Sequence, residues 1–207
     1  MHSSKAPSLT FDEVDDLLYF TRANEFEDLQ QTITELAQKY ECQPREVLEA
    51  AVDPNTGNTM LHFCSANGLT ALLQNLLTQL NSGEPNEAAD GKTVGSLLFN
   101  AQNKEGNTPL HWGAYNGHVE AVKLLVAAGA DMWIKNAAGH LAMFEAERAD
   151  KNEVVQYLLE AGGKKVEQAG QEGQASGEDE VDVQEGEASG SNGSAAVGAK
   201  GDVNVTE

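Results

Sequence analysis

The sequence is poor in cysteine, in aromatic residues and in basic residues. Its two cysteines, Cys42 and Cys64, are too few for a disulfide framework or a cysteine-rich zinc site. We expect Cys64 to be buried and reduced, because it lies among small residues of an expected helix. Only 13 lysines and arginines stand against 33 acidic residues. Because phosphate binding needs basic groups, we expect no direct contact with nucleic acid and favour a basic protein partner.

Long apolar runs and a recognisable signal peptide are also missing. No stretch approaches the roughly 18 apolar residues that a membrane span needs, so we expect a cytoplasmic and nuclear protein without membrane contact. The sequence has no glycine-rich phosphate loop after a strand and no cluster of residues at metal-ligand spacing. Glu145 and Glu147 are close in sequence, but nothing implies a substrate cleft. We therefore expect neither an enzyme nor a cofactor or metal.

A repeat is present instead. The segment NKEGNTPLHWGAYNGHVEAVKLLVAAGAD, residues 103–131, recurs in weaker form 33 residues later and, in GNTMLHFCSANGLTALLQNLL, 49 residues earlier. A period near 33 residues, with a turn and two helices, is typical of ankyrin repeats. The expected fold is an all-α repeat solenoid of about four ankyrin repeats. The expected units are a repeat domain (11–163), repeats at 11–40, 53–80, 99–130 and 132–162, an inserted loop at 81–96, a loop hairpin at 98–106 (LFNAQNKEG) and a short helix at 43–52.

The repeated residues have local physical functions. Thr59 and Thr108 precede the first helices of their repeats, which they can cap. The chain then reverses between helices, which favours a left-handed residue. The expected reversal residues are Asn24, Gly68, Gly117 and Asp150. We expect the second helices to end at Gly129 and Gly162.

The positions of the histidines indicate a structural role and not a catalytic one. His62 and His111 follow the leucine of the repeat, where an imidazole can tie neighbouring loops together through the backbone. Neither histidine has a nearby nucleophile or paired acid of the kind that catalysis requires. His118 follows the turn glycine. His140 lies at a variable surface position and is expected to contact a partner.

Charge separates the C-terminal segment from the rest of the chain. Residues 166–207 contain ten acidic residues and only Lys200 as a base, whereas the remaining residues contain 23 acidic and 12 basic residues. The segment has no aromatic residue and is rich in Gly, Ser, Ala and Glu. Because it cannot bury enough apolar surface to offset the entropy of ordering, we expect a disordered acidic tail over residues 164–207.

The third and fourth repeats carry a closer resemblance. Leu-His-Trp in the third, GHLAMFEAE in the fourth, the insertion after the second and the acidic tail are similar to a family of small fungal ankyrin-repeat chaperones. Each such chaperone is dedicated to the third ribosomal protein of the small subunit, a basic KH-domain protein. The resemblance implies that this chain binds the N-terminal region of that client in a 1:1 complex, as a monomer. It also implies that the chain prevents aggregation of the new client and escorts it to ribosome assembly in the nucleus.

In such repeats the loop tips and the exposed edge of each first helix face the concave groove. The residues expected to contact a partner there are Lys104, Glu105, Asn107, Trp112, Tyr115, Asn116, Trp133, Lys135, His140, Glu145 and Arg148. Tyrosine, tryptophan and arginine dominate interface energetics. Trp133 alternatively packs on the adjacent loop, and Trp112 is expected in the core first and at the contact second.

The fold alone does not fix the partner. A general ankyrin adaptor that scaffolds or inhibits a signalling protein is the alternative to a dedicated chaperone. Identification of the proteins that the chain captures from a cell extract separates the two.

Overall fold

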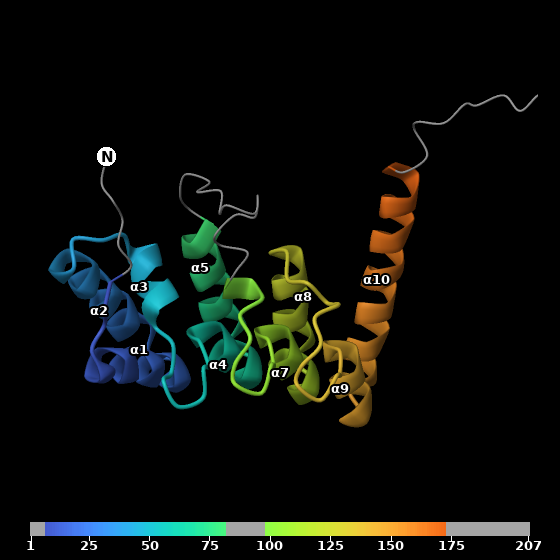
Figure 1. The fold of residues 1–207 in the computed structure, drawn as a ribbon, viewed down its shortest axis with the longest axis horizontal. Helices are drawn as coiled ribbons and strands as arrows, with labels where there is room; N and C mark the ends of the chain where they lie inside the picture. Colours follow the sequence, from blue (N-terminus) through green and yellow to red (C-terminus); the bar gives the residue numbers. More distant parts are fainter. Residues whose placement is uncertain (1–6, 82–97, 173–207) are drawn as a thin grey trace, which may run out of the picture.

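The protein is a two-row array of helices (Figure 1). The computed structural model describes residues 7–81 and 98–172, with side chains described as far as residue 163. The first helices of the repeats form one row: α1 (Phe11–Ala23), α4 (Met60–Asn67), α7 (Pro109–Asn116) and α9 (Ala142–Arg148). The second helices form the other row: α2 (Phe26–Lys39), α5 (Thr70–Asn81), α8 (Val119–Ala127) and α10 (Asn152–Glu172). The short helix α3 (Pro44–Ala50), expected from the sequence, lies against α2 and α5.

The chain reverses between the two helices of each repeat as the sequence predicts. All four expected reversal residues have a left-handed backbone, with φ angles of 59° at Asn24, 66° at Gly68, 81° at Gly117 and 57° at Asp150. At Gly68 the absence of a side chain matters twice, because an added Cβ would also lie 2.6 Å from Nδ1 of His118. The His118 ring reaches back to the preceding repeat, where its Nε2 lies 3.0 Å from the carbonyl oxygen of Ala66.

A threonine and a histidine together organise each central repeat. Thr59 is the N-cap of α4, and Nδ1 of His62 accepts hydrogen bonds from the Thr59 backbone N–H (3.1 Å) and hydroxyl (2.9 Å). Nε2–H of His62 then donates to the carbonyl oxygen of Asn107 in the next loop (2.9 Å). Thr108 and His111 repeat the arrangement toward the carbonyl oxygen of His140 (3.0 Å). The prediction that these histidines tie neighbouring loops through the backbone is confirmed.

Successive loops are also joined by single backbone hydrogen bonds. The Lys104 N–H donates to the Thr56 carbonyl, and the Ala137 N–H donates to the Glu105 carbonyl, both at 2.9 Å. The loop before α7 is shorter than expected, since Leu98 and Phe99 are helical and Phe99 is buried. The sequence prediction of a hairpin from residue 98 was wrong there, because burial of Phe99 favours a helical turn before the loop.

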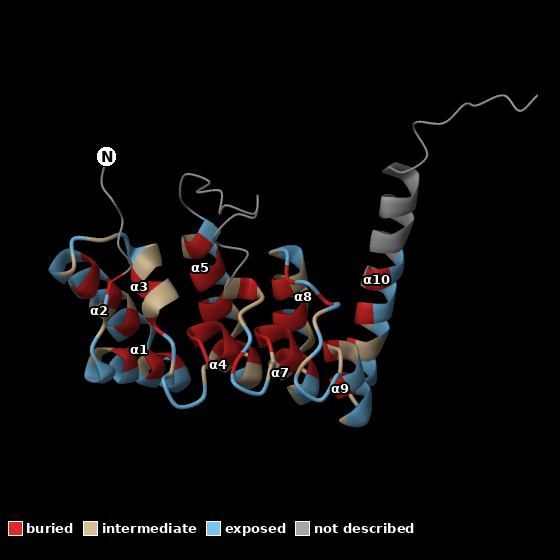
Figure 2. Ribbon diagram, viewed as in Figure 1, coloured by how far each residue is buried: buried red, intermediate tan, exposed pale blue. Residues whose placement is uncertain are grey.

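The core fills the space between the two rows, where Figure 2 shows the buried face of each helix. Its largest fully buried aliphatic side chains come from both rows and include Leu17, Leu29, Leu73, Leu110 and Leu125. Cys64 is buried among them, as expected, and burial raises the pKa of its thiol to about 12. The thiol is therefore protonated and unreactive at neutral pH.

The last helix corrects the predicted boundary of the array. Gly162 does not end α10, which continues to Glu172, so residues 164–172 belong to a helix and not to a tail. Gly162 packs against the preceding loop, where an added Cβ would be in ordinary van der Waals contact with the sulfur of Met132 (3.5 Å) and the ring of Trp133 (3.6 Å). The rest of the expected tail, 173–207, and the expected insertion loop after Asn81 lie outside the described residues.

Candidate functional site

A cavity of about 180 Å³ opens between the third and fourth repeats. The residues that line it come from the third loop, α7 and α9: Glu105, Asn107, His111, Trp112, Tyr115, Glu145 and Arg148. Six of these seven were expected partner contacts, and the period of the repeat explains why they meet. Loop residues and the first residues of α7 share one side of the array, and α9 continues that side one repeat later.

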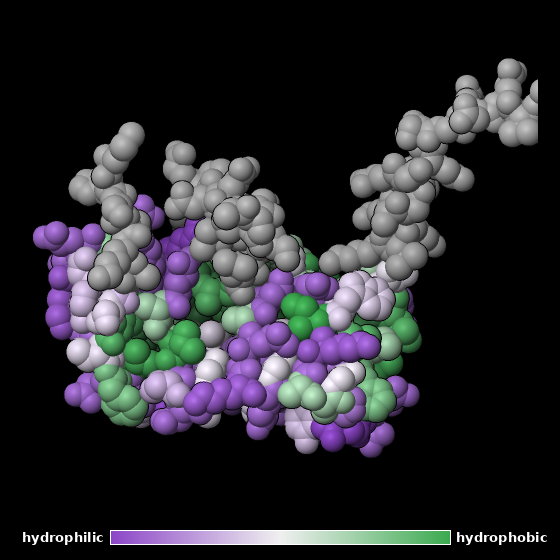
Figure 3. Space-filling model, in the orientation of Figure 1, coloured by the Kyte–Doolittle hydropathy of each residue, from purple (hydrophilic) through white to green (hydrophobic). Residues whose placement is uncertain are grey.

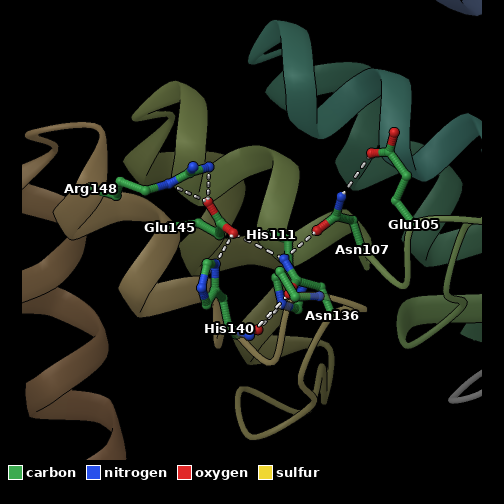
Figure 4. A network of polar contacts seen from close by, with 8 residues as sticks. Glu105, Asn107, His111, Asn136, His140, Glu145 and Arg148 are labelled. Carbon is green, nitrogen blue, oxygen red and sulfur yellow. Dashed lines mark hydrogen bonds and ion pairs between the residues drawn. The ribbon is translucent and has the colours of Figure 1, made fainter.

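One side of the cavity is a polar network centred on Glu145 (Figure 4). Oε2 of this buried carboxylate accepts from Nη2 of Arg148 (2.6 Å) and from its Nε (3.2 Å). Oε1 accepts from Nδ1 of His140 and from the side-chain amide of Asn136, both at 2.9 Å. That amide also donates to the side-chain oxygen of Asn107 (2.9 Å), which links the loops of the third and fourth repeats.

The network keeps its central carboxylate ionised. Burial raises the pKa of Glu145, but hydrogen bonds from His140, Asn136 and Arg148 outweigh burial, so the net pKa lies below its usual range. At His111, burial lowers the imidazole pKa, although the carbonyl of His140 and the charge of Glu145 oppose this. This side of the cavity, the polar wall, is thus a fixed arrangement of hydrogen bonds in which both Glu145 oxygens have partners. The network positions Arg148.

Two side chains project from this wall toward solvent. Tyr115 is 45% exposed, and the guanidinium carbon of Arg148 lies 5.9 Å from the centre of its ring. The Arg148 side chain is itself 57% exposed. Trp112 is half-buried at the cavity and its indole N–H, although buried, has no hydrogen-bond partner among the described residues. Trp112 was expected first in the core, but it is half-buried and lines the cavity instead.

The remaining expected contacts lie elsewhere. Lys104 is exposed and donates from Nζ to the carbonyl of Pro54 (2.9 Å). Asn116 donates to the backbone carbonyl of Trp112 (2.9 Å). Lys135 is exposed in the fourth loop. Trp133, 54% exposed, lines a different hollow at the end of the array, next to α10.

Two residues of this region were missed from the sequence. Asn136 organises the fourth loop, where its side-chain oxygen accepts from the backbone N–H groups of Ala138 (3.1 Å) and His140 (3.0 Å). Asn103 holds the third loop in the same way, so the recurrence of asparagine after one repeat period was a usable signal. Phe144 is 43% exposed with its ring centre 4.4 Å from that of His140, and no sequence signal marked it.

A hollow in the first two repeats was also not expected from the sequence. This cavity of about 180 Å³ lies between α1 and the loop that joins α3 to α4, lined by Phe11, Val14, Asp15, Leu18, Arg22, Asp53, Pro54 and Asn55. Arg22 lies 3.7 Å from Asp15 and over the ring of Phe63, 5.2 Å from its centre. A hydrogen bond from Thr56 is the main reason why the pKa of Asp53 lies below its usual range, despite the opposing effect of burial.

The described residues contain neither a metal-binding cluster nor a membrane-spanning helix. Among them there is no group of three or more His, Cys, Asp or Glu side chains that could hold a metal ion. No described helix is long and apolar enough to cross a membrane. The fold and the site define a class: a helical repeat array with aromatic and charged side chains displayed along one groove.

The chain belongs to the ankyrin-repeat family. Residues 35–169 match the model for three copies of the ankyrin repeat. The chain is 31% identical to the ankyrin repeat-containing protein YAR1 of Saccharomyces cerevisiae over 176 residues, covering 84% of this chain and 82% of the relative. It is 34% identical to an ankyrin repeat-containing protein of Schizosaccharomyces pombe over 148 residues, covering 72% of this chain and 85% of the relative.

A solved structure resembles this one over most of its length. The fold matches a chain in the crystal structure of the yeast ribosomal protein Rps3 in complex with its chaperone Yar1, with a TM-score of 0.64 and 31% identity. The match covers 73% of this chain and 94% of the other.

Proposed function

We propose that this protein is a dedicated chaperone for the small-subunit ribosomal protein that corresponds to Rps3. The observation that carries the proposal is the similarity to Yar1, which extends over 84% of this chain and is matched by the fold of a chain in the Rps3–Yar1 complex. The ankyrin fold alone does not identify the client, because proteins with this fold bind many unrelated partners. A likeness over most of both chains favours the same client.

The charge of the chain supports a basic client. The formal net charge is −20, whereas a protein that binds ribosomal RNA needs a basic surface to neutralise phosphates. Before assembly that surface has no RNA to cover it. An acidic partner lowers the repulsion within the client and competes with unspecific RNA binding, so a complex of the two would remain soluble.

The groove between the third and fourth repeats supplies the specific contact. Tyr115 and Arg148 are held against each other and project from the polar wall, so little conformational entropy is lost when they bind. In this proposal the N-terminal region of the client lies across them, one client to one chaperone. The chaperone binds the client as it is made in the cytoplasm and accompanies it into the nucleus.

Titration of the purified client into the full chain tests this function. Tyr115→Ala should weaken binding by about 2 kcal/mol or more, roughly 30-fold in Kd, as expected for an aromatic interface residue. Tyr19→Ala is the matched control, since Tyr19 is also an exposed tyrosine, 53% exposed, but lies on α1 and lines neither this cavity nor the hollow at α1. Equal binding by both variants would place the contact outside this groove.

Capture from a cell extract separates the proposal from the adaptor alternative. A dedicated chaperone recovers one abundant basic ribosomal protein. Recovery of signalling proteins without that protein, together with no measurable binding of the purified client, would refute the proposed function. Coexpression gives a second readout, because the client should move from the insoluble to the soluble fraction when the chain is present.

A further inference from the structure

The cavity between the third and fourth repeats contains an unpaired hydrogen-bond donor. Trp112 lines this cavity. Within residues 7–81 and 98–163, its indole N–H is the one buried side-chain nitrogen or oxygen that has no hydrogen-bond partner. A buried tryptophan usually places its N–H in a hydrogen bond, and an unpaired buried donor costs free energy. The exception lies at the proposed binding site, which indicates that the bound partner supplies the acceptor.

Packing within the array does not require an indole at this position. The repeat period places Phe63 of the second repeat at the position of Trp112 in the third. Phe63 is half-buried, as Trp112 is, and packs against the core with a ring that has no polar atom. Phenylalanine therefore satisfies the packing of this position, and the indole N–H adds a hydrogen-bonding function that packing does not need.

Two further polar groups of the cavity are available to a partner. Arg148 donates to Glu145 through Nε and Nη2, and no described residue accepts from its Nη1. Glu105 is exposed in the loop before α7, where its Oε2 accepts from the side-chain amide of Asn107 (3.3 Å, Figure 4), and no described residue donates to its Oε1. The cavity thus has donors on α7 and α9 and an acceptor on the loop.

The surface of the central loops also requires a polar match. On the face seen in Figure 3, the surface over these loops is polar and separates apolar surface near α1 and α3 from apolar surface at the α10 end. A segment that covers polar groups must replace the hydrogen bonds that they made to water. A site built around such groups discriminates strongly against a partner that leaves them unpaired.

The charges at the cavity favour a neutral occupant. Its charged side chains are the carboxylates of Glu105 and Glu145 and the guanidinium of Arg148. His111 adds no charge at neutral pH, because burial lowers its pKa. An anion would face two carboxylates and one guanidinium. A lysine or arginine of the partner would lie close to Arg148 and has no oxygen that could accept from the Trp112 N–H.

The depth and size of the cavity favour an inserted side chain with separate donor and acceptor atoms. Because the Trp112 N–H is buried, a peptide group that crosses the mouth of the cavity does not reach it, whereas an inserted side chain can. A single water or hydroxyl needs only roughly 10–15 Å³ of cavity volume, much less than the volume of about 180 Å³ here. A carboxamide has an oxygen that accepts and an NH₂ group that donates, and it is neutral.

We infer that the cavity binds the side chain of an asparagine or glutamine of the client. The inference rests on the proposed function and names the chemical group that the groove recognises. The carboxamide oxygen accepts from the indole N–H of Trp112 and from Nη1 of Arg148, and the NH₂ group donates to the carboxylate of Glu105. The polar wall holds Arg148 in place for this contact.

The indole proton of Trp112 gives a direct readout. Labelling of the full chain with ¹⁵N gives two indole N–H signals, one for each tryptophan, and Trp133→Phe identifies the signal of Trp112. Addition of the purified client should move the Trp112 proton downfield, because it enters a hydrogen bond. A Trp112 proton that does not move downfield in the complex would overturn the inference.

Trp112→Phe removes the N–H and keeps an aromatic ring, as in Phe63 of the second repeat. Client Kd should rise about tenfold, as expected for the loss of one hydrogen bond. Trp133→Phe is the matched control, because it removes the other indole N–H at a residue that does not line this cavity, and it should bind as the wild type does. Equal affinity of the two variants would contradict the inference.

Two variants of Glu105 separate its hydrogen bond from its charge. Glu105→Ala and Glu105→Gln both remove the negative charge, but only glutamine keeps an oxygen that can accept. Glu105→Ala should therefore bind the client more weakly than Glu105→Gln does. Glu105 is exposed, so neither change should lower the melting temperature. Equal affinities would show that Glu105 is not the acceptor and would overturn this part of the inference.

Variants of the client identify the occupant and distinguish this inference from the proposed function. Each asparagine and glutamine of the client's N-terminal region is replaced in turn by alanine. One replacement should raise Kd about tenfold with the wild-type chain and distinctly less with Trp112→Phe, because the two groups are coupled. Failure of the wild-type chain to bind the client refutes the proposed function itself. Binding in which no asparagine or glutamine is coupled to Trp112 refutes the inference alone, and coupling to a serine or threonine would assign a hydroxyl and overturn it as well.

Discussion

Because His62 and His111 are buried, we expect the array to lose stability in mild acid. His62 is 1% exposed and its ring nitrogens both have fixed partners: a donor, the Thr59 N–H, faces Nδ1, and an acceptor, the Asn107 carbonyl, faces Nε2. Protonation would place a second N–H against the Thr59 donor. Burial, chiefly, lowers the pKa of His62 from 6.5 to about 4. Burial lowers the pKa of His111 as well.

The sign and size of the effect follow from linkage. Above pH 6.5 the His62 ring is neutral in both the folded and the unfolded chain, so its contribution to stability is complete. As the pH falls from 6.5 toward 4, the unfolded chain binds a proton that the folded chain excludes, and the free energy of unfolding decreases. With a folded pKa of about 4, His62 alone should remove about 2 kcal/mol between pH 7 and pH 5, at 1.36 kcal/mol per pKa unit. His111 adds a loss of the same sign.

Urea unfolding at pH 7 and pH 5, followed by circular dichroism, measures this loss. His62→Gln is the control: it should be less stable than the wild type at pH 7 but should lose about 2 kcal/mol less between the two pH values. Glu145, whose pKa lies below its usual range, contributes only at lower pH. An unchanged free energy of unfolding between pH 7 and pH 5, with His62 titrating near 6.5 by NMR, would refute the reasoning.

Three further predictions concern packing, the turn and the tail. Leu110→Ala should cost about 2–5 kcal/mol, and Met143→Ala distinctly less, because no repeat among the described residues covers the half-buried Met143; equal losses in urea unfolding would contradict the assigned period. Gly68→Ala should lower the melting temperature, since it strains a left-handed residue and displaces His118; a melting temperature unchanged or raised would argue against the contact. Deletion of residues 173–207 should slow client association at low salt and leave dissociation unchanged, because long-range charge acts on encounter; identical association rates in stopped flow would leave the tail without an electrostatic role.

The helices were predictable from the sequence because their signals are local. Threonine before α4 and α7, and a glycine, asparagine or aspartate at the reversals, act within one turn of the chain. The end of α10 was not predictable in this way. Glycine often ends a helix, but Gly162 lies inside α10, where it packs against Trp133 and Met132 of the loop before α9. The same tertiary override explains why Phe99 is helical.

The groove was predictable as far as the repeat period extends. Tyr115 and Arg148 occupy corresponding positions of successive repeats, and the structure brings them together. Trp133 was assigned to the same surface because it lies in a loop. Its backbone is fixed by Asp131 and its ring turns toward α10, and that direction depends on a side-chain contact that no spacing in the sequence encodes.

The histidine ties give the array a direction and an end. Each tie begins at a histidine of one repeat and finishes at a carbonyl of the following loop, from His62 to Asn107 and from His111 to His140. At the next equivalent position, one period after His111, the chain has Phe144. A repeat inserted between the second and third could accept a hydrogen bond from His62 at its loop carbonyl and could donate one from its own histidine to the carbonyl of Asn107. A repeat added after the fourth would lack this hydrogen bond, because Phe144 has no N–H to donate to the carbonyl of its loop. Duplication of a repeat should therefore be tolerated better in the middle of the array than at its C-terminal end.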